Sequence, residues 1–382
     1  MKKLCFVTTV SLTIKAFLIP VLNRFRDNTS WELTVICDED DSLQEALPAG
    51  VRYIPVPMKR GISLGGIGAC WKMYQIFRKE KFDLVQYSTP NASVYASIAA
   101  WAAGVKHRIY HLMGYRFLGF SGIKAEIFKL LEKLACSLAT KVECVSKSNL
   151  RIGVEMGLFP DKKVSVLYHG SSAGVDLGRF DISKKEIWRK ELRQEFGYSN
   201  ADCVFGFAGR ITGDKGINEL LRAFEKMSRA DTRLFLVGRQ EEQHTLDQRL
   251  WNQAINSDRV TVHPEVKDIE RYFSMMDVLI LPSYREGFGN IVIEAEAMGV
   301  PVIVTDIPGP TDAMLPEETG LVVKVRDVDS LYAAMERLAG DPELRKRLGK
   351  AGAEFAARNF DQKILTEKIL ADRKRLLGIC EE

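Results

Sequence analysis

The stretch LPSYREGFGNIVIEAEAMGVPVIVTD, residues 281–306, decides the fold. It leaves an apolar run, passes through the glycine-containing turn EGFG, continues as a helical segment from about Asn290 to Met298, and enters a second apolar run at 302–305. Strand, turn, helix and strand in this order are typical of parallel strands joined by a helical crossover. The stretch therefore predicts one repeating unit of an α/β domain.

Similar units extend from this stretch toward both ends of the chain. Short β-branched runs, each followed by a turn and a helical segment, occur at 4–10, 33–37, 51–56, 84–87, 107–111, 141–145 and 164–168, and again at 204–207, 234–237, 260–262, 278–281, 302–305 and 321–325. Continuous apolar runs of this kind predict parallel strands that helices cover on both faces. We expect two doubly wound, Rossmann-like α/β domains.

The boundary between the two domains is indicated by a change in composition. The highly charged segment 176–202 joins the last strand of the first series to the first strand of the second, and residues 341–382 show no strand pattern. We therefore expect an N-terminal domain at 1–180 and a C-terminal domain at 181–360. A C-terminal helix at 361–382 is expected to pack back across the domain junction.

The composition excludes several classes of protein. Of the 382 residues, 46% are apolar and 27% are charged, which excludes disordered, collagen-like and coiled-coil chains. The net charge of +4 is too small over this length to indicate nucleic acid binding. Seven cysteines, an odd number without a C-x-x-C pair, support neither a zinc site nor a disulfide framework, so we expect reduced thiols in the cytoplasm. No apolar run is long enough to predict a membrane-spanning helix.

Two nucleotide-binding motifs are missing from the sequence. The turn after the first predicted strand, TTVSLTIKAF, lacks G-x-G-x-x-G, and no G-x-x-x-x-G-K-[ST] occurs in the chain. NAD binding and P-loop ATP hydrolysis are therefore disfavoured, and we expect no cofactor and no metal.

Residues 207–224, FAGRITGDKGINELLRAF, predict a site for a diphosphate. A strand ends at Gly209, and Arg210 and Lys215 follow just before a helix begins. Arginine offers a forked donor, lysine a point charge, and the helix start its free N–H groups. A surface loop with solvated charges is the alternative.

Two carboxylates flank the glycine turn of the opening stretch. Glu286 lies just after a predicted strand, and Glu294 lies eight residues later within the following helix. A nucleotide sugar needs hydroxyl acceptors at both ends and phosphate donors between them, and the carboxylates and turn amides supply both. One Glu near a helix start commonly interacts only with the helix dipole. Two Glu around a glycine turn, together with the Arg/Lys loop, are harder to explain in that way.

These segments carry a resemblance to a known family. GR…KG, EGFGNIVIEA and GVPVIVTD resemble the retaining glycosyltransferases of family 4, whose GT-B fold has two Rossmann-like domains facing across a cleft. The segments 167–180 and 79–117 resemble the junction and the acceptor-domain core of the bacterial capsule, O-antigen and exopolysaccharide members.

The resemblance implies a donor site in the C-terminal domain. The family residues that match Arg210 and Lys215 bind the donor diphosphate, and those that match Glu286 and Glu294 bind the donor sugar and the ribose hydroxyls. Base contacts are expected from the main chain near 237–239 and 262–266. The implied donor-binding residues are Gly209, Arg210, Lys215, Val266, Glu286, Gly287, Phe288, Gly289, Asn290, Ile291 and Glu294.

An acceptor side is implied in the N-terminal domain. His111 in YHLMGYR matches a family residue that faces the transferred sugar, with a buried core histidine as the alternative. The implied acceptor-binding residues are Thr9, Ser88, Thr89, Asn91, His111 and Arg116, and the implied catalytic residues are Glu286, Arg210, Lys215 and His111. Where the family often has glycines after the first strand, this chain has Thr8, Thr9 and Ser11.

The resemblance also implies an activity. We expect a retaining, metal-independent glycosyltransferase that moves a hexose or N-acetylhexosamine from a UDP-linked donor to a polyprenyl diphosphate-linked saccharide in bacterial surface polysaccharide assembly. Its location is expected to be cytoplasmic, peripheral on the cytoplasmic face of the inner membrane, without nucleic acid as a partner. The alternatives are a glycosyltransferase with a soluble acceptor and a non-catalytic nucleotide-sugar-binding protein. A sugar-nucleotide epimerase of the same fold would need an acid/base set that is not found.

Two further segments allow competing interpretations. Residues 121–140 place apolar side chains at helical spacing among Lys124, Lys129 and Lys133, which predicts either a helix packed on its own sheet or a surface helix that meets anionic lipid. The segment CDEDD at 37–41 has the D-x-D spacing of some metal sites, but its position after an early strand predicts a solvated acidic turn.

Overall fold

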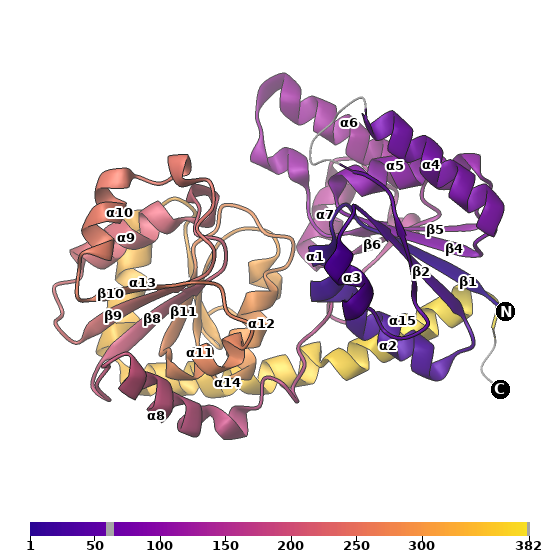
Figure 1. The fold of residues 1–382 in the computed structure, drawn as a ribbon. Coiled ribbons are helices and arrows are strands. Elements are labelled where there is room, and N and C mark those ends of the chain that lie inside the picture. The colour runs from indigo at the N-terminus through magenta and orange to yellow at the C-terminus, as the bar shows by residue number, and fades with distance from the viewer. Residues whose placement is uncertain (59–64, 380–382) are drawn as a thin grey trace. The chain divides into compact units, whose positions relative to one another are not determined.

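The computed structural model describes residues 1–58 and 65–379, which divide into two compact units (Figure 1). The first unit comprises Met1–Ala173 and Gln362–Glu382, and the second comprises Gly174–Asp361. The division after Ala173 lies a few residues before the expected boundary. The C-terminal segment belongs to the N-terminal unit.

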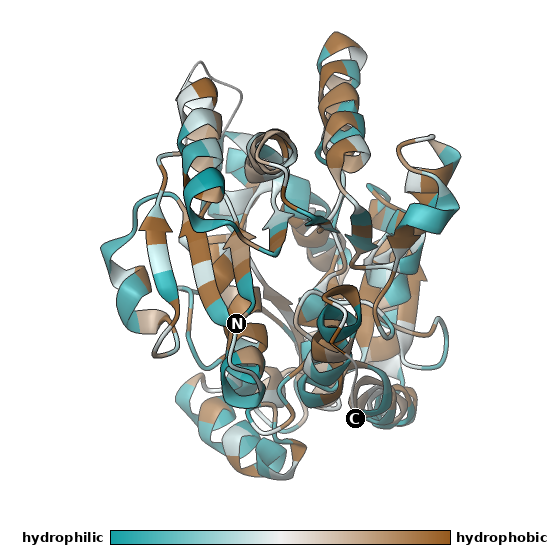
Figure 2. Ribbon diagram, turned by 90° about the vertical axis from the view of Figure 1, so that its right-hand side faces the viewer, coloured by the Kyte–Doolittle hydropathy of each residue, from teal (hydrophilic) through white to brown (hydrophobic). Residues whose placement is uncertain are grey.

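The sheet of the first unit is parallel throughout, with the strand order β3-β2-β1-β4-β5-β6-β7. Its strands are β1 (Lys3–Val7), β2 (Glu32–Cys37), β3 (Arg52–Pro55), β4 (Leu84–Ser88), β5 (His107–Leu112), β6 (Lys141–Cys144) and β7 (Val164–Ser165). Alternate residues of β1 enter different cores: Leu4 and Phe6 pack on one face of the sheet, and Cys5 and Val7 on the other. Burial on both faces explains why the central strands are mostly apolar, which Figure 2 shows as brown segments with fewer teal ones between them.

Helices cover both faces of this sheet. The first core includes α2 and α15, and the second includes α4, α5 and α6. In Figure 1, α15 lies beside α2, where Leu365 and Ile369 pack in one core with Leu22 and Phe25. The helices are α1 (Ser11–Thr13), α2 (Ile19–Asn28), α3 (Asp41–Ala46), α4 (Gly65–Glu80), α5 (Pro90–Ala102), α6 (Gly122–Leu138), α7 (Lys147–Glu155) and α15 (Gln362–Leu376), with the short turns η1 (Ile14–Leu18), η2 (Arg116–Gly119) and η3 (Asp161–Lys163).

The second unit repeats the design with the parallel order β10-β9-β8-β11-β12-β13. Its strands are β8 (Cys203–Ala208), β9 (Thr232–Val237), β10 (Val260–His263), β11 (Val278–Leu281), β12 (Val302–Thr305) and β13 (Gly320–Val323). Its helices are α8 (Lys185–Glu195), α9 (Ile217–Lys226), α10 (Gln248–Ile255), α11 (Ile269–Met275), α12 (Asn290–Ala297), α13 (Val328–Gly340) and α14 (Pro342–Phe360), with the turns η4 (Ile182–Lys184), η5 (Gly213–Lys215), η6 (Gln243–Thr245) and η7 (Pro310–Asp312).

Every strand predicted from an apolar run is present, although several are shorter than predicted, most clearly β1, which ends at Val7, and β7, which comprises Val164–Ser165. The two threonines that follow β1 form hydrogen bonds within a turn and with the residue after β4. Thr8 Oγ1 donates to the carbonyl of Val10, and the N–H of Thr9 donates to Thr89 Oγ1. These bonds turn the chain into a helix at Ser11 instead of extending the strand.

Candidate active site

The order of strands marks one edge of each sheet as a binding site. Consecutive crossovers leave in opposite directions from β1 and β4 in the first sheet, and from β8 and β11 in the second. In open α/β sheets, ligands bind beyond the carboxyl ends of the strands at such switch points. Most of the residues implied for the donor and acceptor sites follow these four strands.

The loop after β8 is held against the end of β11 by a glycine. Gly216 has a φ of +73°, and a Cβ placed on it would lie 2.0 Å from the carbonyl oxygen of Pro282. A residue with a side chain would force the loop away from β11. Gly216 therefore brings Lys215, the residue before it, to the loop that carries Glu286.

Lys215 and Glu286 form an ion pair in the second unit. Lys215 Nζ lies 2.5 Å from Glu286 Oε1, and both side chains are less than 20% exposed. Ser283 Oγ donates to the same carboxylate oxygen at 2.8 Å, and Thr305 Oγ1 on β12 donates to the carbonyl of Ser283 at 2.6 Å. Strand β12 therefore holds Ser283, Ser283 holds the carboxylate of Glu286, and this carboxylate holds the ammonium group of Lys215.

Arg210, the second predicted cation, lies on the more exposed side of the same loop. Its side chain is 43% exposed and lies 3.8 Å from Asp214 and 3.5 Å from Glu241. Because such exposed ion pairs are weak, the guanidinium of Arg210 can reorient toward a phosphate at little free-energy cost. Gly209, the preceding residue, has a φ of +148° at the end of β8.

The glycine turn after Glu286 ends as the start of a helix. Gly289 has a φ of +85° and is the N-cap residue of α12, and Phe288 is buried beneath the turn. The first N–H groups of α12, from Asn290 and Ile291, lie at the positive end of the helix dipole, which suits an anion. The start of α12 therefore offers an anion-binding site that lies between Glu286 and Glu294 in the sequence.

Glu294 lies about one turn into α12 and is half-buried. Burial, partly offset by Arg179 and reinforced by Glu270, raises the pKa of its carboxyl to about 7. Arg179 Nε donates to Glu270 at 2.9 Å, so the Arg179 guanidinium is already paired with another carboxylate. Val266 lies half-buried in the loop between β10 and α11, and its contact with a base stays a prediction.

In the first unit, the residues after β1 and β4 are hydrogen-bonded to each other. The hydroxyls of Thr9 and Thr89 lie 2.7 Å apart, and Thr9 Oγ1 accepts from the N–H of Ala92 at 3.2 Å. Thr89 has a φ of +68°, an unusual conformation for a β-branched residue. Ser88 and His111, at the ends of β4 and β5, are register partners.

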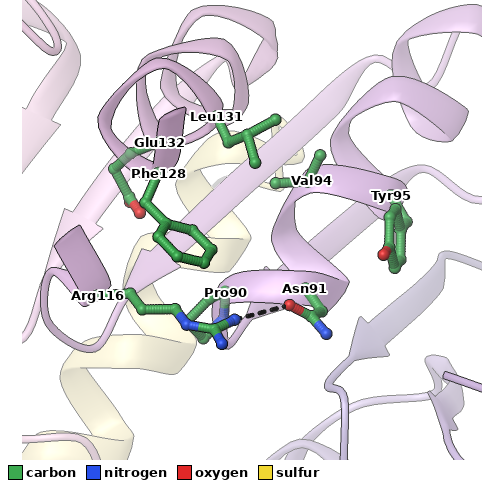
Figure 3. A pocket seen from close by; sticks show the side chains of 8 residues that line it. All are labelled: Pro90, Asn91, Val94, Tyr95, Arg116, Phe128, Leu131 and Glu132. Carbon is green, nitrogen blue, oxygen red and sulfur yellow. Dashed lines mark hydrogen bonds between the residues drawn. The ribbon is translucent and has the colours of Figure 1, made fainter. Parts of the chain in front are cut away.

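Asn91 and Arg116 line a small pocket between α5 and α6 (Figure 3). Arg116 donates to Asn91 Oδ1 at 3.1 Å, and the Arg116 guanidinium lies 4.5 Å from the centre of the Phe128 ring. The pocket has a volume of about 90 Å³ and is lined by Pro90, Asn91, Val94, Tyr95, Arg116, Phe128, Leu131 and Glu132.

His111 is part of a buried network that the sequence did not reveal. Its Nδ1 lies 3.2 Å from Glu143 Oε1, and Glu143 is paired with Arg373 of α15, which also contacts Gln86. Glu143 and Arg373 are separated by most of the chain, so only the register of β5 with β6 and the packing of α15 bring them together.

The D-x-D segment forms a turn, as predicted, but its two aspartates are half-buried and not solvated. Asp40 is the N-cap of α3, accepting from the N–H of Ser42 at 2.9 Å, and it forms an ion pair with Lys15 at 2.8 Å. Asp38 Oδ1 accepts from the N–H of Met58 at 3.0 Å. Both carboxylates therefore have structural partners.

A capsular polysaccharide biosynthesis glycosyltransferase of Staphylococcus aureus, CapM, is 31% identical over 317 residues, which are 82% of each chain. The family model for Glycosyltransferase Family 4 matches residues 25–173, and the model for Glycosyl transferases group 1 matches residues 189–355. The chain belongs to the family 4 glycosyltransferases. The UDP-Gal:α-D-GlcNAc-diphosphoundecaprenol α-1,3-galactosyltransferase of Escherichia coli is 27% identical over 83% of this chain and 82% of its own.

The fold of this glycosyltransferase is also found among solved structures. HepE of Anabaena, solved in complex with UDP, superposes with a TM-score of 0.79 at 20% identity over 98% of this chain and 100% of its own. The predicted GT-B class of two Rossmann-like units and the predicted family are thereby confirmed. The roles of the individual site residues stay predictions.

We expect this glycosyltransferase to transfer sugar at the same initial rate with and without EDTA. Across residues 1–58 and 65–379, no three His, Cys, Asp or Glu side chains are grouped so that they could hold a metal ion. Arg210 and Lys215 can instead neutralise the phosphates of a donor. The measurement is the initial rate with and without chelator. Loss of the rate in EDTA and its recovery with Mg²⁺ or Mn²⁺ would contradict the prediction.

Proposed function

We propose that this glycosyltransferase moves a hexose or N-acetylhexosamine from a UDP-linked donor to a polyprenyl diphosphate-linked saccharide, with retention at the anomeric carbon and without a metal. The observation that supports the donor half best is the Lys215–Glu286 pair, fixed beside the start of α12 at the switch point of the second sheet. Cation, carboxylate and helix start are the groups that a sugar diphosphate needs.

The chemistry asks the protein mainly to stabilise the leaving diphosphate. Negative charge grows on the phosphate oxygens as the bond to the sugar breaks, and Lys215, Arg210 and the amides of α12 are suited to meet it. Glu286, held by Ser283, is suited to accept hydrogen bonds from sugar hydroxyls. In the proposed route, the acceptor attacks from the side on which the diphosphate leaves, and a phosphate oxygen takes its proton.

UDP is the proposed donor nucleotide because the Escherichia coli relative is named for UDP-Gal and HepE was solved with UDP. We expect UDP-hexoses or UDP-N-acetylhexosamines to raise the melting temperature more than GDP- or ADP-sugars do. A ligand at about 100 times its Kd stabilises the folded state by about 2.7 kcal/mol, which a thermal-shift panel resolves easily. A larger shift with GDP- or ADP-sugars would contradict the choice of UDP.

A lipid-linked acceptor is supported by apolar surface on the first unit. One stripe of α6 is exposed, with Ile123 82%, Ile127 46% and Leu130 66% accessible, and Trp71 on α4 is 60% accessible. Between α4 and α5 lies a mostly apolar groove of about 830 Å³, lined by Ile67, Cys70, Trp71, Tyr74, Tyr95 and Ile98, among others. Exposed apolar surface of this kind is typical of sites that contact membranes, other proteins or apolar ligands, and a lipid-linked acceptor would make use of it.

A transfer assay separates the two kinds of acceptor. Labelled donor is incubated with a polyprenyl diphosphate-linked saccharide or with the same saccharide free in water, and the product is partitioned between organic and aqueous phases. We expect label in the organic phase and much slower transfer to the free saccharide. Equal rates would favour the soluble acceptor, and a β-linked product from an α-linked donor would exclude retention.

No helix in the described parts of the chain is long and apolar enough to cross a membrane. Contact with lipid is therefore proposed to occur at the surface, through the stripe on α6 and the lysines around it. Lys124 and Lys133 are exposed, Lys129 is half-buried, and the Nζ of Lys124 lies 4.2 Å from the centre of the Phe120 ring. An apolar stripe with lysines at its edges suits an anionic bilayer surface.

A further inference from the structure

The imidazole of His111 is held from one side by a chain of buried charges. His111 is 7% exposed, Glu143 2%, and Arg373 is fully buried. The His111 Nδ1 lies 3.2 Å from Glu143 Oε1, and Arg373 Nη1 lies 2.8 Å from the other oxygen of the same carboxylate. Arg373 Nη2 donates to Gln86 Oε1 at 2.9 Å.

The sheet register and the C-terminal helix build this chain together. His111 on β5 and Glu143 on β6 are register partners, so their side chains lie on the same face of the sheet. Ile109, two residues earlier on β5, packs in the core that contains Leu365 and Ile369 of α15. His111 therefore faces α15, which carries Arg373.

The network places three cations, those of Lys141, Arg373 and Arg375, beside two carboxylates, and this positive charge fixes the state of Glu143. Asp372 lies 2.5 Å from Arg373 Nη1 and 2.7 Å from Lys141 Nζ, and it also pairs with Arg375, whose side chain reaches the surface. Burial alone would raise the pKa of Glu143, but Arg373 and His111 hold it well below its usual range. Glu143 is therefore a carboxylate.

An ionised carboxylate can only accept hydrogen bonds. The proton between the two groups must then lie on Nδ1 of His111, and in the neutral imidazole this leaves the Nε2 lone pair as an acceptor. His111 lies at the end of β5 in register with Ser88, beside the other acceptor-side residues.

A buried ion pair such as Glu143–Arg373 is weak evidence for stability, because desolvation offsets its attraction. We therefore attribute the network to the orientation of the His111 imidazole and not to the stability of the folded state.

We propose that Glu143 and Arg373 are positioning residues that hold His111 as the Nδ1–H tautomer, so that Nε2 accepts a hydrogen bond from a sugar hydroxyl. The role of His111 at a sugar rests on the proposed function, whereas its tautomer does not. Arg373 acts through Glu143 by keeping the carboxylate charged and fixed, and α15 thereby contributes to a site built from the other end of the chain.

The test is Glu143→Gln, which keeps the shape but replaces the acceptor by an amide that can donate. Truncating Arg373 is a poorer test, because it would leave Glu143 and Asp372 buried without their partner and could unfold the unit. The ¹⁵N spectrum of the His111 imidazole should show Nδ1–H in the wild type and a shift toward Nε2–H in Glu143→Gln. We expect kcat to fall about ten- to a hundredfold, as for other supporting hydrogen bonds, with the donor KM unchanged.

A double-mutant cycle separates positioning from general damage. His111→Asn keeps a donor toward Glu143 but removes the Nε2 acceptor, so adding Glu143→Gln to it should lower kcat no further. Asp202→Asn is the matched control, because Asp202 is a buried carboxylate paired with Arg233 at 3.4 Å, and its kcat should stay at the wild-type value.

The proposal is overturned if Glu143→Gln keeps the wild-type spectrum, or if it lowers kcat equally with and without His111. The spectrum needs no substrate and decides the tautomer by itself. A wild-type protein that shows Nδ1–H but transfers no sugar would overturn the proposed function and leave the tautomer assignment standing.

Discussion

Replacing Lys215 by alanine is expected to lower kcat at least about a hundredfold, because one preorganised donor to a developing oxyanion is worth about 3 kcal/mol. The structure strengthens this expectation. The Lys215 side chain is 18% exposed and its ammonium group is held by Glu286 at 2.5 Å, so it is fixed before the charge on the leaving group grows. Its loss also leaves Glu286 without its cation. The measurement is kcat, with the circular dichroism spectrum as a check on folding.

Lys226→Ala is the matched control for this prediction. Lys226 lies at the far end of α9, the helix that Lys215 precedes, and it forms an ion pair with Asp329 on the surface. Since exposed pairs contribute little, this variant should keep the wild-type kcat and a nearly unchanged stability. A Lys215→Ala protein that is folded and turns over at a near-normal rate would remove Lys215 from the proposed mechanism.

The parallel architecture could be predicted because the central strands, such as β1 and β8, are buried on both faces and therefore rich in apolar residues. The donor loop could also be predicted in outline, since the residues after β8 and β11 are close in sequence to strand, glycine and helix signals. What the sequence could not show is the ion pair between Lys215 and Glu286. That contact depends on Gly216 lying against Pro282, a feature of tertiary packing.

The His111 network was missed for a related reason. Glu143 resembles any charged residue within a short strand, and Arg373 resembles any basic residue near a helix end. Their pairing requires β5 and β6 to be neighbours and α15 to return to the first sheet. Neither condition leaves a local signal, so long-range polar networks of this kind have to be found in the structure.

For α6, the structure confirms a helix packed on its own sheet for one face, whereas contact of the other face with lipid stays a prediction. Ala135 and Cys136 are buried in the core of the first unit, as a helix packed on its own sheet requires. Ile123, Ile127 and Leu130 recur at helical spacing on the opposite, exposed stripe. The helix is therefore anchored in the fold and still presents an apolar surface.

We expect the simultaneous change of Lys124, Lys129 and Lys133 to glutamate to abolish sedimentation of the protein with anionic vesicles at low salt. Each lysine near such a surface contributes about 1 kcal/mol of attraction, which the substitution turns into repulsion. The apolar stripe stays intact, so a loss of binding reports on charge. Binding of the wild type should weaken as salt screens the attraction, and donor binding, measured by thermal shift, should be unchanged because the implied donor residues lie in the second unit.

The triple change of Lys79, Lys81 and Lys106 to glutamate serves as the matched control, because it alters the charge of the same unit by the same amount. These exposed lysines lie near the amino ends of β4 and β5, away from the carboxyl edge that the site candidates share. This control should sediment like the wild type if the position of the charge matters and the total charge does not. Should the wild type fail to sediment, or the α6 variant sediment equally well, the stripe does not meet lipid. The soluble acceptor would then become the better proposal, since the apolar surface would no longer support a lipid-linked one.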